Sequence, residues 1–597
     1  MKNISLNKGL GALWYPLIFG LYLCCTPAQA NNRLRQMQSP HQQNQISGTI
    51  TDGTNPLPGV TISLKGKRNN TVNSDFNGQY ILSATATDTL LVSFIGFKTA
   101  IVPIRGQKII NIQLQEDMTS LQEVRVNAGY YSVKESERTG SIAKITTKDI
   151  EKQPINNPLA AMQGRMAGVN ITQNTGLPGG GFSIQIRGIN SIRAGGNDPL
   201  YIVDGLPYGS QSLVTNSLAN GILPGTISPL NNINPNDIEG IEVLKDADAT
   251  AIYGSRAANG VVLITTKKGK AGATHFNINT ATTIGKIARK TDLMNTQQYL
   301  AMRREGFAND EIVEYPDYEY DVNGTWSQTR NTDWQKELLG GTSYSNNTQA
   351  SVSGGSENTQ FLLSGTYRRE TNVFPGEARY GKGALHSSMV HSSGDHKFKL
   401  TFSADYVADK NTLPGIDLTN AAYNLPPNAP ALYDASGKLN WENGTFENPL
   451  AFLESTFLAT TQNLISNALL SYKLSPAWEF RTSLGYNDIQ LSESLTSPST
   501  MFNPAYGAGP EYSALSVSSA KRNSWIIEPQ LNWAKKWGAL EFNALAGTTF
   551  QMQKSQQLSQ NGAGFVSNSL INDLAAAARL SIVNHELSEY KYNAVYG

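Results

Sequence analysis

The histidines are the first side chains to consider for chemistry, because imidazole is a common general base and the commonest metal ligand. The chain has six histidines in 597 residues, and His386, His391 and His396 follow one another at steps of five. A five-residue step along a strand places neighbouring side chains on opposite faces, so these three do not converge on one metal ion. No H-x-x-E zinc motif or G-x-S-x-G nucleophile elbow occurs in the sequence. We therefore expect no enzyme activity, no metal site and no cofactor.

Four aromatic residues in polar, irregular sequence are better suited to binding than to catalysis. They are Tyr423, Tyr433, Trp441 and Phe446. Flat apolar faces with polar edges can stack on a sugar ring or pack against a partner protein that acts as a lid. The sequence does not distinguish a ligand contact from a lid contact.

The charge of the chain argues against nucleic acid as a partner. The formal net charge is +1 and charged residues make up 16% of the sequence, against about 25% in an average soluble protein. Domains that bind nucleic acid usually carry a basic patch or stripe. We therefore expect no nucleic-acid partner.

Residues 1–30 have the layout of a secretory signal peptide. Two lysines precede the apolar run "GLGALWYPLIFGLYLCC", which is followed by the small-residue cleavage pattern "AQA". The run is marginal for a membrane-spanning helix, so we expect cleavage before Asn31 rather than an anchor. Both cysteines lie in this segment, and we therefore expect an exported mature protein without disulfides.

Several different patterns follow one another up to residue 272. Residues 31–45 are rich in Gln and Asn, which predicts a flexible leader. Residues 46–117 contain about seven short strand patterns separated by turn signals such as "DGTNPLPG", which indicate a small antiparallel β-sandwich. Residues 118–140 have the pattern of a linker. Residues 141–272 mix short helices, "PLAAMQGRMAG" and "DADATAIYGS", with strands such as "GVVLITTKK", which predicts an α+β unit.

Residues 273–597 are dominated by apolar–polar alternation with the two-residue period of a strand. In "KFKLTFSADYV", Phe398, Leu400 and Phe402 share one face. Long and short connections alternate between the strand candidates, as in outer-membrane barrels, whereas a soluble sandwich has no need of this asymmetry. The prediction is a mainly β protein that ends in the first part of a transmembrane antiparallel β-barrel. About ten candidates lie near 273–285, 344–354, 359–372, 380–392, 396–408, 461–474, 478–492, 521–534, 538–551 and 588–597.

Two motifs carry a family resemblance: "PLYIVDGLP" at 199–207 and "INPNDIEGIEVLKDADATAIYGSRAANGVVLITTKKGK" at 233–270. They resemble SusC/RagA-type TonB-dependent outer-membrane transporters, and residues 46–117 resemble the carboxypeptidase-regulatory-like domain common at this family's N-terminus. The resemblance implies that residues 141–272 form a plug inside a 22-stranded barrel. Ten strands are fewer than half of that number. We therefore expect this sequence to be truncated, and to be the N-terminal part of a complete transporter.

The resemblance implies active import of an oligosaccharide or a peptide across the outer membrane, together with a SusD-like surface lipoprotein. Energy would come from TonB, acting through ExbB and ExbD, with the N-terminal domain and the TonB box in the periplasm. Two alternatives remain: a siderophore or cobalamin receptor of the same fold, which the SusC-like motifs disfavour, and a surface-displayed adhesive barrel, which the plug disfavours.

The strand-like core of the linker lies where this family carries its TonB box. An extended segment can add to the edge of a partner's sheet through backbone hydrogen bonds. Arg125 and Asn127 depart from the Val-rich family pattern, which leaves the register open, and an ordinary linker is the alternative. The candidate residues are Leu121, Gln122, Glu123, Val124, Arg125, Val126 and Asn127.

Two plug arginines, Arg187 in "IQIRG" and Arg256 in "YGSRAANG", are candidates for ion pairs that hold the plug in the barrel. A buried arginine is costly unless it is paired, and an inward-facing Glu479 or Glu528 could supply the carboxylate. Solvated arginines are the alternative.

Overall fold

The structure is a computed structural model that describes residues 44–53, 55–115, 125–127, 132–134, 142–153, 155, 157–193, 196–209, 213, 218–223, 228–245, 253–538 and 540–597. The chain divides into two compact units, Met1–Glu123 and Val124–Gly597. Among the helices of these described ranges, none is long and apolar enough to cross a membrane.

The first unit is a small β-sandwich, as predicted. Its described strands form two sheets with the orders β4-β1-β7 and β3-β2-β5-β6. Alternation along β4 places Tyr80 and Leu82 in the core and Ile81 outside. One detail differs from the prediction, because β7 runs parallel to β1 rather than antiparallel. The strands are β1 Asn44–Thr51, β2 Thr61–Leu64, β3 Lys67–Asn73, β4 Gln79–Ala84, β5 Thr89–Ser93, β6 Ala100–Pro103 and β7 Ile112–Gln113.

The second unit contains an α+β part, residues 142–267, which we call the plug unit. Five of its described strands form one sheet with the order β10-β15-β16-β13-β14. The central strand β16 is almost continuously apolar and is buried on both faces. The strands are β10 Ile142–Thr146, β11 Val169–Gln173, β12 Phe182–Ile186, β13 Leu200–Val203, β14 Leu206–Tyr208, β15 Ile238–Leu244 and β16 Val261–Thr266.

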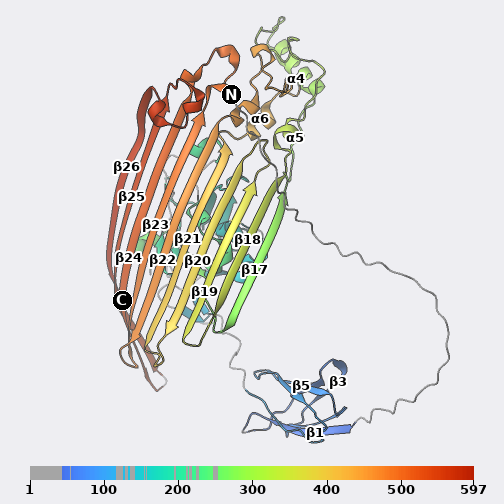
Figure 1. Ribbon diagram of the computed structural model, residues 1–597, viewed down its shortest axis with the longest axis vertical. Coiled ribbons are helices and arrows are strands. Elements are labelled where there is room, and N and C mark those ends of the chain that lie inside the picture. Colours follow the sequence, from blue (N-terminus) through green and yellow to red (C-terminus); the bar gives the residue numbers. More distant parts are fainter. Residues whose placement is uncertain are drawn as a thin grey trace, which may run out of the picture. The chain divides into compact units, whose positions relative to one another are not determined.

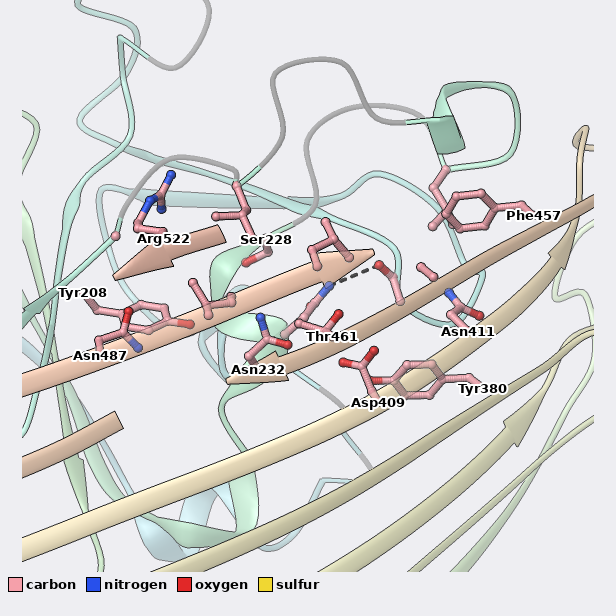
Figure 2. Close-up of a pocket in the computed structure, with 18 residues that line it drawn as sticks. Tyr208, Ser228, Asn232, Tyr380, Asp409, Asn411, Phe457, Thr461, Asn487 and Arg522 are labelled. Carbon is pink, nitrogen blue, oxygen red and sulfur yellow. Dashed lines mark hydrogen bonds between the residues drawn. The ribbon is translucent and has the colours of Figure 1, made fainter. Parts of the chain in front are cut away.

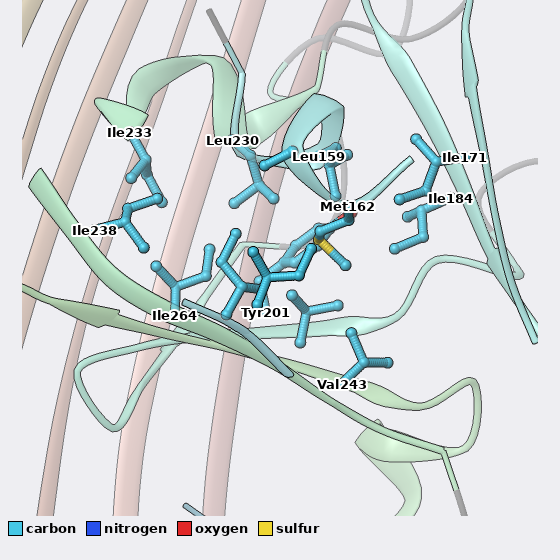
Figure 3. Packing of buried hydrophobic residues seen from close by; sticks show 14 of the residues in the cluster. Leu159, Met162, Ile171, Ile184, Tyr201, Leu230, Ile233, Ile238, Val243 and Ile264 are labelled. Carbon is cyan, nitrogen blue, oxygen red and sulfur yellow. The ribbon is translucent and has the colours of Figure 1, made fainter. Parts of the chain in front are cut away.

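Helices in the plug unit are short. They are α1 Thr147–Ile150, α2 Pro158–Met162 and the 3-10 turns η2 Leu218–Gly221, η3 Pro229–Asn232, η4 Pro235–Asp237 and η5 Gly254–Ala257. Helix α2 packs Leu159 and Met162 against Tyr201, Val243 and the other core side chains in Figure 3. Of the helix expected at "DADATAIYGS", residues 246–252 lie outside the described residues, and the end of the segment forms η5.

In the described ranges from residue 272 onward, ten strands form one antiparallel sheet in sequential order, which we call the wall (Figure 1). All ten predicted strands are present. The sheet is consistent with part of a barrel. The strands are β17 Gly272–Gly285, β18 Ser343–Gly355, β19 Thr359–Thr371, β20 Arg379–Ser392, β21 Phe398–Pro414, β22 Thr456–Lys473, β23 Trp478–Ser497, β24 Ala514–Trp537, β25 Leu540–Ala563 and β26 Arg579–Tyr596.

The two faces of the wall differ as the alternation predicted. On β23, Phe480 and Tyr486 are exposed, whereas Asn487 on the opposite face is buried. The polar face is the one that hydrogen-bonds to the plug unit, for example through Ser403 of β21. At the short-turn end, Trp533 contacts Trp478 at a ring-centroid distance of 6.1 Å. The apolar outer face and this aromatic cluster are typical of a lipid-facing barrel.

The long connections all lie at one end of the wall and fold on themselves (Figure 1). Three of the four are shorter than predicted, because the strands beside them continue several residues further towards this end, whereas the connection between β17 and β18 has nearly its predicted length. Their helices are α4 Thr296–Asn309, α5 Trp334–Leu339 and α6 Thr419–Asn424, and their 3-10 turns are η6 Glu442–Gly444, η7 Pro449–Leu453, η8 Ser499–Met501, η9 Pro504–Tyr506, η10 Pro510–Tyr512, η11 Asn568–Leu570 and η12 Leu574–Ala576.

Candidate functional site

Asp204 joins the plug unit to the wall. It lies in the tight turn between β13 and β14 with φ +48°, inside the motif "PLYIVDGLP". Its carboxylate accepts hydrogen bonds from the Thr266 backbone N–H at 2.9 Å and hydroxyl at 2.6 Å, and from the Ser403 hydroxyl of β21 at 2.8 Å. Its backbone carbonyl accepts from Asn467 Nδ2 of β22. One aspartate therefore fixes the turn, the central plug strand and two wall strands.

Asp237 makes a second junction of the same kind. It lies in η4, in the motif "INPNDIEG", and is buried. Its Oδ1 accepts from Ser364 Oγ at 2.8 Å and Gln349 Nε2 at 2.9 Å, both on wall strands, and its Oδ2 accepts from Asn234 Nδ2 at 2.6 Å. These donors are hydroxyl and amide groups rather than cations.

His386 makes a third junction, which sequence reasoning missed. Its side chain is fully buried, with Nε2 2.9 Å from the Lys267 backbone carbonyl and Nδ1 2.8 Å from Asp405 Oδ1. A carbonyl and a carboxylate both act as acceptors, so the ring donates from both nitrogens as imidazolium. Lys382, four residues earlier on the same face, donates from Nζ to the Asn231 carbonyl at 2.7 Å. The four-residue spacing of Lys382 and His386, which places both on one face of a strand, was the available signal.

The two plug arginines have different surroundings. Arg187 follows β12 with φ +60° and is exposed. Arg256 reaches the wall: its Nη1 donates to Gln551 Oε1 of β25 at 2.6 Å, and its guanidinium lies 4.1 Å from the ring centroid of Tyr592 on β26. Glu528 is buried on β24, where it accepts from Thr549 Oγ1 at 2.9 Å. An ion pair between one of these arginines and Glu479 or Glu528 stays a prediction.

A cavity of about 60 Å³ lies between the plug unit and strands β20–β24 (Figure 2). At roughly 10–15 Å³ for each water molecule, it holds only a few waters. Tyr208 projects into it, and burial raises the pKa of this phenol to about 12. The labelled lining residues are Tyr208, Ser228, Asn232, Tyr380, Asp409, Asn411, Phe457, Thr461, Asn487 and Arg522.

The four loop aromatics do not share one environment. Tyr423 and Tyr433 are exposed and Trp441 is partly buried. Phe446 is only 1% exposed, and its ring meets Trp326 edge-on at 6.1 Å in a small core with Trp334. This burial corrects our expectation for Phe446, which here joins two loops instead of facing a ligand or a lid.

The TonB-box candidate is described only in part. Residues 121–124 lie outside the described residues. Arg125–Asn127 form β8, which pairs antiparallel with β9, Ser132–Lys134. This part of the candidate is therefore extended and already paired on one edge. In the described part of the chain, no group of three or more His, Cys, Asp or Glu residues could hold a metal ion.

Two protein-family models match the same two parts of the chain, the N-terminal sandwich and the plug unit. A family model described as TonB-dependent receptor plug domain matches residues 134–261, and one described as carboxypeptidase-regulatory-like domain matches residues 46–126. The chain is 30% identical over 537 residues to the TonB-dependent receptor SusC of Bacteroides thetaiotaomicron, covering 85% of this chain and 50% of that protein. It is 29% identical over 572 residues to the TonB-dependent receptor P3 of Formosa agariphila, covering 93% and 53%.

The RagAB peptide importer in its open-open state shares the fold, with a TM-score of 0.64 and 22% identity over 79% of this chain and 54% of that chain. The chain spans about half the length of the curated relatives it matches. A plug unit docked on the polar face of an antiparallel wall defines a TonB-dependent receptor. Within that class, the chain belongs to the SusC/RagA type.

Proposed function

We propose that the protein is a TonB-dependent outer-membrane importer of an oligosaccharide or a peptide. The observation that carries this proposal is the docking of the plug unit on the inner face of the wall through Asp204, Asp237 and His386. A plug held at several points obstructs passive flow, so passage requires work on the plug. The apolar outer face of the wall supports placement in a lipid bilayer.

The energy would be delivered by TonB, acting through ExbB and ExbD, on the segment Leu121–Asn127 in the periplasm. An extended backbone can pair with the edge of a partner's sheet, and β8 has this extended conformation. Among the described residues β8 pairs with β9 alone, so its other edge could take such a partner.

A SusD-like lipoprotein would cover the external mouth of the importer. The long connections form a folded surface there, and Tyr423 and Tyr433 expose their rings on it. Such rings suit either a protein lid or a sugar. The relatives named SusC and RagAB support this assignment as members of the same class.

Deletion of residues 121–127 from the full-length protein tests the proposal. We expect loss of growth on the cognate substrate, whereas labelled substrate still binds at the cell surface, because the external loops and the docked plug are unchanged. Val124→Ile is the matched control and should grow normally, since it preserves an extended backbone. Normal growth of the deletion strain would show that passage needs no pull through this segment.

A further inference from the structure

A second cavity, which we call the arginine cavity, lies between the plug unit and strands β24–β26. Its volume is about 330 Å³, against about 60 Å³ for the cavity in Figure 2. Sites for small ligands usually measure about 300–1,000 Å³. The arginine cavity can therefore admit one sugar ring, whereas the smaller cavity admits only water. The residues that matter for its chemistry are Asp198, Arg256, Arg522, Gln551, Gln553 and Tyr590.

Arg256 supplies the first cation from the plug side. Its Nη1 is held by Gln551, and its guanidinium plane lies over Tyr592. Its Nε is buried and has no hydrogen-bond acceptor. A buried donor without an acceptor carries a desolvation cost, and an anion in the cavity would offset the positive charge of this guanidinium.

Arg522 supplies the second cation from the wall side. Its side chain is largely buried, and its Nε donates to Ser555 Oγ at 3.2 Å. Its Nη1 lies against Gly209, where an added Cβ would come within 2.4 Å of it. The absence of a side chain at Gly209 thus lets this guanidinium lie in the lining.

The described lining carries two guanidinium groups and only one carboxylate, that of Asp198. Its charge therefore favours an anion. The planar fork of arginine matches a carboxylate better than a point charge does. Two amides, Gln551 and Gln553, and the Tyr590 phenol add neutral groups that suit hydroxyls, and the phenol ring offers a stacking face.

We propose that the arginine cavity binds the carboxylate of a uronic-acid residue in an acidic oligosaccharide. The proposal rests on the import function above, because it names a substrate class for the same lumen. Hydroxyl-binding groups beside the guanidiniums favour a sugar acid over an acidic peptide. The carboxylate would contact Arg256 and Arg522 while the ring lies among the amides and Tyr590.

The test is calorimetric titration of the purified full-length protein in detergent, without TonB. The probes are trimers of galacturonate, glucuronate and mannuronate, their methyl esters, and triglutamate. We expect at least one acidic trimer to bind about tenfold or more tightly than its ester, since the ester keeps the hydroxyls but loses the charged acceptor. Arg256→Gln and Arg522→Gln should each reduce binding of that acid about tenfold, with little effect on the ester.

Three further variants separate a ligand contact from a structural role. Gly209→Ala displaces the Arg522 guanidinium without removing its charge and should weaken binding of the acid several-fold. Arg256→Lys should restore part of the affinity lost in Arg256→Gln. Arg193→Gln, which removes an exposed plug arginine, should change nothing. Unaltered thermal unfolding of the variants would confirm that the plug unit remains folded.

Two outcomes overturn the proposal. Equal or absent binding of every acid and its ester would show that the cavity is not a carboxylate site. Binding of triglutamate in preference to all three sugar acids would show that the ligand is a peptide. Neither outcome depends on energy coupling, so a failure here is distinguishable from a failure of the deletion test for import.

Discussion

Asp204 of the plug unit accepts a hydrogen bond from the Ser403 hydroxyl of the wall at 2.8 Å, although 199 positions separate the two residues in the sequence. The same carboxylate oxygen accepts from the Thr266 hydroxyl. The Asp204 side chain therefore both holds two strands of the plug unit together and attaches the plug unit to the wall.

Asp204→Asn should loosen the plug unit at this junction. The amide retains one acceptor oxygen and points its NH₂ group at a site where two hydroxyls now donate, so we expect a loss of about 1–3 kcal/mol. Denaturant unfolding and hydrogen exchange of β16 would measure it. Ser403→Ala removes one of the bonds and should cost about 1 kcal/mol. Unchanged exchange in Asp204→Asn would contradict this role.

His386→Ala should weaken the third junction. The change leaves the Asp405 carboxylate without its imidazolium and the Lys267 carbonyl without its donor, and breaking such a buried pair typically costs about 3–5 kcal/mol. We expect faster hydrogen exchange at the C-terminal end of β16. His391→Ala, on the opposite face of β20, is the matched control and should leave this exchange unchanged. An equal effect of the two substitutions would show that His386 is not a specific junction between β20 and the end of β16.

Asp333 should make the loop helix α5 sensitive to acid. Burial acts to raise the pKa of this carboxyl, but hydrogen bonds from Lys290 Nζ and the Lys336 backbone N–H outweigh it, and the pKa lies below its ordinary value. The stabilisation is therefore complete above the unfolded value of about 3.9 and is lost as the pH falls through the lowered value. Limited proteolysis of the loop across this range would detect the loss.

Substitutions at Asp333 separate the helix cap from the charge. Asp333→Ala should cost about 0.5–2 kcal/mol at neutral pH, because it removes the N-cap. Asp333→Asn keeps the cap but lacks the charge, so it should lose the charge-dependent part of the stabilisation at neutral pH and, with it, the acid sensitivity. If proteolysis of the loop still increases in acid in Asp333→Asn, another group is responsible for the acid sensitivity.

Phe446→Ala and Tyr433→Ala should affect different properties, the first the stability of the loops and the second binding. Phe446 fills a core between two loops, so its truncation should destabilise them by about 3–5 kcal/mol. Tyr433 is exposed, so its truncation should leave stability within about 0.5 kcal/mol and weaken binding of a lid or a substrate. Proteolysis rates and surface binding would be compared for both variants. Normal loop stability in Phe446→Ala would contradict the core assignment.

The ten wall strands were predictable from the sequence because one face of the wall is apolar and the other packs polar side chains on the plug unit, which together enforce alternation. The outer ends of the strands were not. Strand β24 begins at Ala514 and β25 ends at Ala563, beyond the predicted limits near 521 and 551. Segments such as "SVSSA" and "KSQQLSQNG" are mostly polar on both faces, so a periodic pattern does not reveal that backbone pairing continues there.

The junctions were harder to predict than the strands. His386 meets a backbone carbonyl, which any residue could provide, and an aspartate whose position depends on the register between β20 and β21. The error at Phe446 has a related cause, because the partners of a loop core, here Trp326 and Trp334, lie more than a hundred positions away in sequence. Asp204 and Asp237 lie in quoted motifs, but their wall partners are ordinary Ser and Gln residues.

The hydrogen-bond partners of Asp204 and Asp237 are neutral, which affects how these two junctions would respond to force. A hydrogen bond to a hydroxyl or an amide is largely lost once its atoms separate beyond about 3.5 Å, whereas attraction between opposite charges persists over several ångströms. A displacement of one residue along an extended chain, about 3.3 Å, is therefore enough to break both junctions. Under a pull of the kind proposed above, these two sets of hydrogen bonds would hold until their atoms separate and would then be lost within the displacement of a single residue.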